Sequence, residues 1–475
     1  MKPDIRPTRQ VMAMAALMLG CAHAQAQAPD AGAAAPLKLS TTVTLSEHTG
    51  EWLPRSSDCR QAVPQRLEGL TLMGALEQVL CKSPLLSQAL LLVSEQQAGV
   101  DLAQSAYRPR LSINAEASAN RIPSSNSGSD SLSASVTGSL GLSWVVFDFG
   151  VRDANLEQAR QALASARAAQ DSATLNAINQ ALLLYVDAAA AFARLEAARE
   201  GEAVNRQSLE AAQAKYEASV GSLSEKLQAE TALAQAVLER VRAEGAWETA
   251  RGLLAVAMGL PTGQRMTLAP AAHAFPDAEI PGDIPRWIAD ARDGHPRVRS
   301  ARADIRALQA RLDSIKAEGR GNVGVSLGMA STKGLGASAG KIESGLTGYI
   351  VASVPIFNRP EQQAREAQVL AQVESRRDAQ IAVERDIESE LWRSARLMET
   401  EQQNLTAAQS LRTIAAQSYD ITLGRYKAGV GSILELLSTQ TALANARTQV
   451  TQAQLSFAQA RLRLAVASGK IALRK

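Results

Sequence analysis

The chain has 475 residues, and 46% of them are hydrophobic although only 4% are aromatic. Its formal net charge of +3 shows no basic excess of the kind that binds nucleic acid, so we expect no nucleic-acid partner. The length favours roughly two or three domains. The histidines and cysteines show no metal-ligand spacing and no nucleophile–base pair, so we expect no cofactor and no enzyme activity.

The N-terminus has the features of a secretory signal peptide. Basic residues precede the apolar run Val11–Leu19, and small-residue cleavage sites follow within 22–26. The run is too short to span a membrane. We therefore expect residues 1–24 to be removed and the mature protein to leave the cytoplasm without a transmembrane helix. Cys21 lies in a sequence that resembles a lipoprotein cleavage box, and lipidation of Cys21 is the alternative.

Residues 25–66 are rich in proline, serine and threonine without periodicity, and are expected to form an irregular extension. Signal-peptide cleavage leaves Cys59 and Cys81 in an oxidising compartment, which favours a disulfide between them. The alternative is that Cys81 is an ordinary buried apolar residue of the first predicted helix.

A segment of the chain occurs twice. Lys215–Ala236 matches Arg425–Ala446, which begins 210 residues later (215 to 425), and 12 of the 22 aligned positions are identical. A second, unlike pair of segments matches at the same spacing, which indicates a duplicated unit of about 200 residues. We predict a first repeat over 67–270, a linker over 271–283 and a second repeat over 284–475.

Each half of the chain follows the same predicted plan. A helical segment, 70–106 in the first half and 284–318 in the second, leads into two short segments in which apolar and polar residues alternate. Such segments have the length of tilted membrane strands, and soluble hairpins are the alternative. The predicted strands span 111–121, 134–147, 322–331 and 345–354.

A very long helical hairpin follows each pair of strands, over 151–259 and 360–469. Apolar residues spaced three and four apart form a heptad seam between Leu175 and Phe192. No proline interrupts Val151–Tyr216, which as a helix would be roughly 100 Å long. Such helices need partners along their whole length, so we expect a coiled-coil-like assembly.

The predicted strands require more than one chain. Four strands are too few to close a barrel, and open sheet edges cannot face lipid. Two chains would give eight strands and an interior filled by side chains, whereas three would give twelve strands and a lumen. Because the helices continue from the strands, the assembly is expected to be a conduit in which a strand barrel leads into a helical barrel.

Over roughly residues 67–470, this arrangement resembles the TolC-like outer-membrane factors, the outer membrane efflux proteins. The matching motifs are S-P-L at 83–85, H-P-R at 295–297, A-Y-R-P-R-L at 106–111 and the segment that begins at Tyr426. The resemblance implies a mainly α fold with a membrane β-barrel part. Each of three identical chains would contain an internal repeat and would contribute four strands to the barrel. The barrel would lie in the outer membrane of a Gram-negative bacterium, above a long periplasmic helical barrel.

The resemblance implies the exit duct of a tripartite export machine. Cargo would arrive from an inner-membrane ABC transporter, or from an RND or MFS pump, through a periplasmic adaptor. The implied function is type I secretion of a protein toxin of the adenylate cyclase-haemolysin kind, and multidrug efflux is the alternative. The alternative function that is not a channel is that of a secreted coiled-coil structural protein or a periplasmic adaptor. An adaptor would carry only one hairpin, and a filament would need no strands.

The resemblance also implies where the pore closes. Glu435 and Ser438, with their repeat counterparts Glu225 and Gln228, are expected to line a constriction at the hairpin tips. Three copies of Glu435 around a narrow lumen would favour cations. An ordinary solvated helix carboxylate is the alternative for Glu435.

Further tip residues are implied to hold the gate and the adaptor. Tyr426 falls on a gate position, and Gly431 stands where TolC has a gate arginine, which puts the TolC ion-pair latch in doubt. The adaptor is expected to dock on the turns, where glycine is also an ordinary turn former. The docking residues are Ala218, Ser219, Val220, Ala428, Gly429 and Val430.

Overall fold

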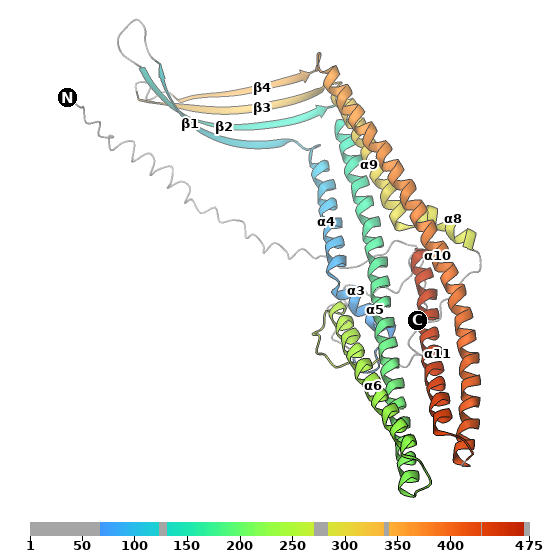
Figure 1. Cartoon of the computed structure of the whole chain (residues 1–475). Helices are drawn as coiled ribbons and strands as arrows, with labels where there is room; N and C mark the ends of the chain where they lie inside the picture. The colour runs from blue at the N-terminus through green and yellow to red at the C-terminus, as the bar shows by residue number, and fades with distance from the viewer. Residues whose placement is uncertain (1–66, 123–130, 270–283, 337–341, 429, 470–475) are drawn as a thin grey trace, which may run out of the picture.

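The computed structural model describes residues 67–122, 131–269, 284–336, 342–428 and 430–469. A curved four-stranded sheet lies at one end, and long helices run from it to two hairpin tips at the other end (Figure 1). The predicted signal peptide, the irregular extension and the linker lie outside the described residues, as do Cys21 and Cys59.

The two halves of the chain contain the same elements in the same order (Figure 1). The first half has α3 (Leu72–Lys82), α4 (Pro84–Ser105), β1 (Arg110–Ile122), β2 (Ser131–Phe147), α5 (Val151–Glu217) and α6 (Leu223–Ala257). The second half has α8 (Ile284–Gly294), α9 (Pro296–Glu318), β3 (Asn322–Gly336), β4 (Ile342–Ser353), α10 (Arg359–Lys427) and α11 (Ile433–Ala467).

The first helical segment of each half, predicted as continuous, is two helices. Ser83 and His295 have extended ψ angles of 119° and 133°, and each precedes a proline that starts the next helix. Proline disfavours helical backbone in the residue before it and fits the first position of a helix, so the break falls there. Among the described helices none is by itself long and apolar enough to cross a membrane. Only the bent pair α3 and α4 meets both criteria together.

His295 caps the start of α9 from a buried position. Its Nδ1 atom accepts a hydrogen bond from the backbone N of Arg297 at 3.2 Å. The side chain is buried. Burial is the main cause that lowers the pKa of His295 to about 4, and the positive charge of Arg297 is the second cause. The imidazole is therefore neutral in the folded protein at neutral pH.

We expect acid to destabilise the protein through His295. Between about pH 6.5 and pH 4 the unfolded chain binds a proton at His295 and the folded chain does not, so stability falls as pH falls through this window. The full effect is roughly 3 kcal/mol per chain. Urea unfolding of wild type and His295→Asn, which keeps a capping side chain, should diverge across this window. Parallel pH profiles would contradict the prediction.

The strands form one antiparallel sheet in the order β1-β2-β3-β4, so β2 and β3 join the two repeats. One row of facing residues is apolar and the next row, on the opposite face, is polar or small. The apolar row is Ile113, Leu140, Met329 and Leu346. The adjacent row is Asn114, Ser139, Ala330 and Gly345. The pairing therefore gathers the predicted alternation of four separate segments into one apolar face and one polar face.

The helices repeat the order of the strands. Next to the sheet, α4 packs on α5, α5 on α9, and α9 on α10. Each strand is joined to one of these helices, so the helical layer has the order α4-α5-α9-α10 beside β1-β2-β3-β4 (Figure 1). Toward the tips, α6 packs on α5, and α11 packs on both α5 and α10. One chain is thus a curved wall with two open edges.

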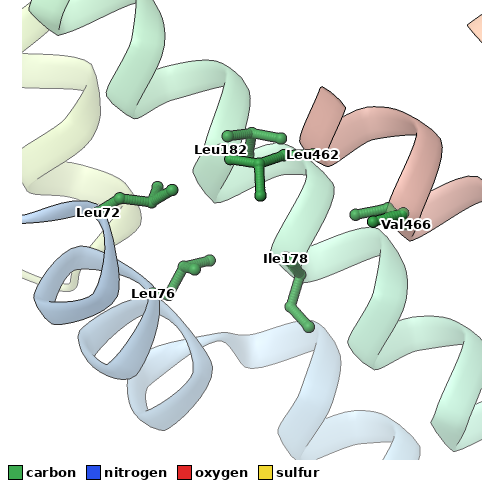
Figure 2. A pocket seen from close by; sticks show the side chains of 7 residues that line it. Leu72, Leu76, Ile178, Leu182, Leu462 and Val466 are labelled. Carbon is green, nitrogen blue, oxygen red and sulfur yellow. The ribbon is translucent and has the colours of Figure 1, made fainter. Parts of the chain in front are cut away.

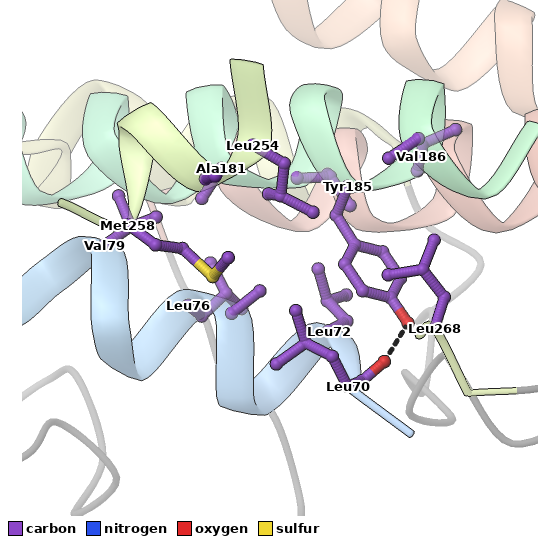
Figure 3. Close-up of a cluster of buried hydrophobic side chains, with 14 of the residues drawn as sticks. Leu70, Leu72, Leu76, Val79, Ala181, Tyr185, Val186, Leu254, Met258 and Leu268 are labelled. Atoms are coloured by element: carbon purple, nitrogen blue, oxygen red, sulfur yellow. Dashed lines mark hydrogen bonds between the residues drawn. The ribbon is translucent and has the colours of Figure 1, made fainter. Parts of the chain in front are cut away.

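The largest core lies at the middle of α5, where α3, α6 and α11 approach it. Tyr185 is fully buried there, and its hydroxyl donates a hydrogen bond of 2.9 Å to the carbonyl oxygen of Leu70 (Figure 3). A parallel bridge pairs Leu70 with Leu268, which ties the start of the first repeat to the segment after α6. In Figure 2, leucines of α3 and α5 surround a small apolar cavity together with Leu462 and Val466 of α11.

Candidate functional site at the helical hairpin tips

Both hairpins end in turns of the same geometry. The amide N of Gly221 donates to the carbonyl oxygen of Lys215 at 3.0 Å, and that of Gly431 donates to Arg425 at 3.2 Å. A Cβ atom on Gly221 would lie 3.0 Å from Lys215 Cβ, and one on Gly431 would lie 3.0 Å from the backbone N of Tyr426. A larger residue at either position would therefore be tightly packed against the end of the preceding helix, which favours glycine at both.

The predicted docking residues are at the surface wherever they are described. Ser219 has a left-handed φ of 61°, a conformation that glycine adopts more easily. Its repeat counterpart, Gly429, lies outside the described residues. The role of these turns in docking stays a prediction. The other four predicted docking residues are exposed: Ala218, Val220, Ala428 and Val430.

The second helix of each hairpin begins with a capping serine followed three residues later by glutamate. The hydroxyl of Ser222 accepts a hydrogen bond from Glu225 N, and that of Ser432 accepts one from Glu435 N, each at 3.2 Å. A carboxylate in the first turn also interacts favourably with the helix dipole. Both glutamates therefore stabilise the start of a helix, whatever else they do. The Ser-x-x-Glu spacing is the signal in the sequence that indicates such a cap.

The structure brings together two of the four predicted constriction residues. Gln228 of α6 and Ser438 of α11 line one open groove between these helices, beside Leu227 and Leu437. Glu225 lies one helical turn before Gln228, and Glu435 lies one turn before Ser438. Neither glutamate lines that groove. The role of the four residues in a constriction remains a prediction.

Glu435 has a partner that the sequence did not indicate. The Nη1 atom of Arg425, near the end of α10, lies 2.9 Å from the Oε1 atom of Glu435, near the start of α11. Both side chains are about half exposed, so solvent screens the ion pair and it adds little to stability. The repeat aligns Arg425 with Lys215, which was the available signal for a basic group here.

Tyr426 occupies a different environment from its repeat counterpart, Tyr216. The side chain of Tyr426 is buried against Ile433 and Leu436, whereas that of Tyr216 is 41% exposed. Lys215 of the other hairpin places its Nζ atom 3.6 Å from the centroid of the Tyr426 ring, a cation–π contact. Within the described chain the hydroxyl of Tyr426 has no hydrogen-bond partner. Tyr426 thus joins the two hairpin tips through its ring.

Polar contacts also join the hairpins along α5 and α11. Arg194 Nη2 donates to Gln452 Oε1 at 3.1 Å, and Arg447 forms an ion pair with Glu200. Nearer the tips, the hydroxyl of Ser208 lies 3.3 Å from the side-chain amide oxygen of a glutamine on α11. The seam between the hairpins is therefore apolar at the core around Tyr185 and polar toward the tips.

The remaining predictions are a disulfide between two cysteines and the absence of a metal site. Cys81 lies in α3 and is disulfide-bonded, while Cys59 is outside the described residues, so their pairing stays a prediction. In the part of the chain that is described, no cluster of histidine, cysteine, aspartate and glutamate could hold a metal ion.

Comparison with known proteins identifies the family. The sequence model of the family described as Outer membrane efflux protein matches residues 75–260 and 287–470, one match in each repeat. Protein CyaE of Bordetella pertussis is 29% identical to this chain over 412 residues, which cover 86% of this chain and 85% of that protein. The family and its solved structures are channels and not enzymes.

Solved structures share the fold at low sequence identity. The CmeC outer membrane channel of Campylobacter jejuni matches 91% of this chain and 91% of its own, with a TM-score of 0.72 at 16% identity. The outer membrane protein VceC of Vibrio cholerae matches 84% of this chain and 96% of its own, with a TM-score of 0.69 at 17% identity. The predicted fold class and family are confirmed. The chain belongs to the outer membrane efflux protein family and is an outer-membrane protein with a periplasmic helical part.

Proposed function

We propose that three copies of this chain form the outer-membrane exit duct of a type I secretion machine for a protein toxin. TolC-like members of the family are trimeric and work with an adaptor and an inner-membrane pump. The observation that carries the proposal is the position of the open edges. β1 and α4 end one side of the wall, and β4 and α10 end the other, so a copy of the chain can continue both layers at once.

The sheet edges require such neighbours. β1 and β4 each pair on one side only, and backbone groups left unpaired in lipid cost several kcal/mol each. Three chains supply twelve strands, enough for a barrel with a lumen. The apolar face would then meet lipid, and the polar face, where the hydroxyls of Thr137 and Thr332 lie 3.0 Å apart, would meet water.

The helical edges favour the same closure. On α4, Leu85 and Leu92 lie seven positions apart on one face and are 60% and 42% exposed. On α10, Ile381 and Trp392 are also about half exposed. An apolar stripe on each outer helix is what two copies would bury against one another, since exposed apolar patches of this kind mark interfaces.

The cargo is proposed from the likeness to CyaE, a type I secretion component, over most of both chains. Its partners would then be an ABC transporter and a periplasmic adaptor. We expect deletion of the gene to remove a large polypeptide from the culture medium and to leave drug susceptibility unchanged. The wild-type gene should restore secretion. Increased drug susceptibility with normal secretion would instead assign the duct to multidrug efflux.

A further inference from the structure

The ion pair at the second hairpin tip bears on what the duct entrance would admit. Arg425 and Glu435 lie on opposite sides of the turn between α10 and α11, and the turn brings their side chains to 2.9 Å. The basic group of this pair comes from the last turn of α10. A capped helix start fixes the backbone of Glu435, because Ser432 accepts its amide hydrogen.

Two lysines of the first hairpin, near the same tip region, have contacts of their own. Lys215 faces the ring of Tyr426, and Lys226 lies 3.8 Å from Glu230 on α6. Among the described residues, Glu435 forms an ion pair with Arg425, and this pair has no net charge. A bare ring of three glutamates, as the family resemblance implies, would have a net charge of −3.

We propose that Arg425 determines the ion selectivity of the duct entrance, because it neutralises Glu435 in each of the three chains. The inference rests on the proposed function, since it needs a conducting trimer. The entrance potential then depends on the pair and not on Glu435 alone. Weak pairing suits such a site, because an exposed ion pair costs little to separate when cargo passes.

Reversal potentials across planar lipid bilayers test the pair. Arg425→Gln leaves one unpaired carboxylate per chain and should raise the cation-to-anion permeability ratio by about tenfold at low salt, and by less at high salt. Glu435→Gln leaves one unpaired guanidinium per chain and should lower the ratio by a similar factor. The double variant should return close to the wild-type value.

Two further variants separate the pair from a general charge effect. Arg425→Lys keeps the positive charge and should conduct like wild type. Arg412→Gln removes an exposed charge from the same helix, away from the tip, and should change the ratio much less than Arg425→Gln.

Two outcomes would overturn the inference while leaving the duct intact. In the first, Arg425→Gln channels keep the wild-type permeability ratio. In the second, the double variant behaves like Glu435→Gln alone, which would make Glu435 the sole determinant. A wild-type protein that forms no channels in the bilayer would overturn the duct itself, and the inference with it.

Discussion

Replacement of Gly321 by alanine should prevent the chain from reaching the outer membrane in folded form. Gly321 lies between α9 and β3 and has a φ of +95°. A Cβ atom there would lie 2.2 Å from the carbonyl oxygen of Ser353 and 3.0 Å from the Cα atom of Val354. Both neighbours are backbone atoms at the end of β4, so they cannot move aside as a flexible side chain would.

The cost should be roughly 3 kcal/mol or more, because steric overlap adds to an unfavourable backbone conformation. The amount of folded protein in outer-membrane fractions measures the effect. Gly345→Ala is the matched control, since a Cβ atom at Gly345 in β4 would meet nothing within 4 Å. Normal levels of the Gly321→Ala protein would mean that the junction between helix and strand is placed wrongly.

Truncation of Tyr185 should be the most damaging change in the helical part. Tyr185 is fully buried in the largest core, and its ring fills the space between Leu70 and Leu268 (Figure 3). Tyr185→Ala should cost roughly 3–5 kcal/mol per chain through lost burial and a cavity. Tyr185→Phe should cost only about 1 kcal/mol, because Leu70 O still accepts a hydrogen bond from Ala269 N.

Urea unfolding followed by helical circular dichroism would measure both changes in the detergent-solubilised protein. Tyr216→Ala is the control, since Tyr216 is 41% exposed at a hairpin tip and should lower stability by less than 1 kcal/mol or so. Equal losses for Tyr185→Ala and Tyr216→Ala would contradict the position of the core.

The sequence predicted the kinds of elements because their periods are local properties. Alternation in the strands and the heptad seam on α5 follow directly from which side chains share a face. The pairing of Leu140 with Met329, which joins strands from different repeats, could not be derived, because nothing local specifies which strands are neighbours. The break at Ser83 could have been predicted, since the proline that follows it disfavours a helix.

The site was predicted less completely than the fold, because its contacts depend on tertiary structure. The repeat aligned Tyr216 with Tyr426, yet only Tyr426 is buried, because the side chains that pack around the two tyrosines differ. Lys215 meets the Tyr426 ring from the other hairpin, a contact between residues 211 positions apart (215 to 426). The pair of Arg425 with Glu435 depends on how tightly one turn reverses the chain.

The number of chains in the complex tests the proposed duct most directly. Native mass spectrometry of protein extracted from the outer membrane counts the chains in each particle. The open edges at β1 and β4, and at α4 and α10, predict three chains per particle. A particle that contains a single chain would contradict the closure of the barrel and the duct inferred from it.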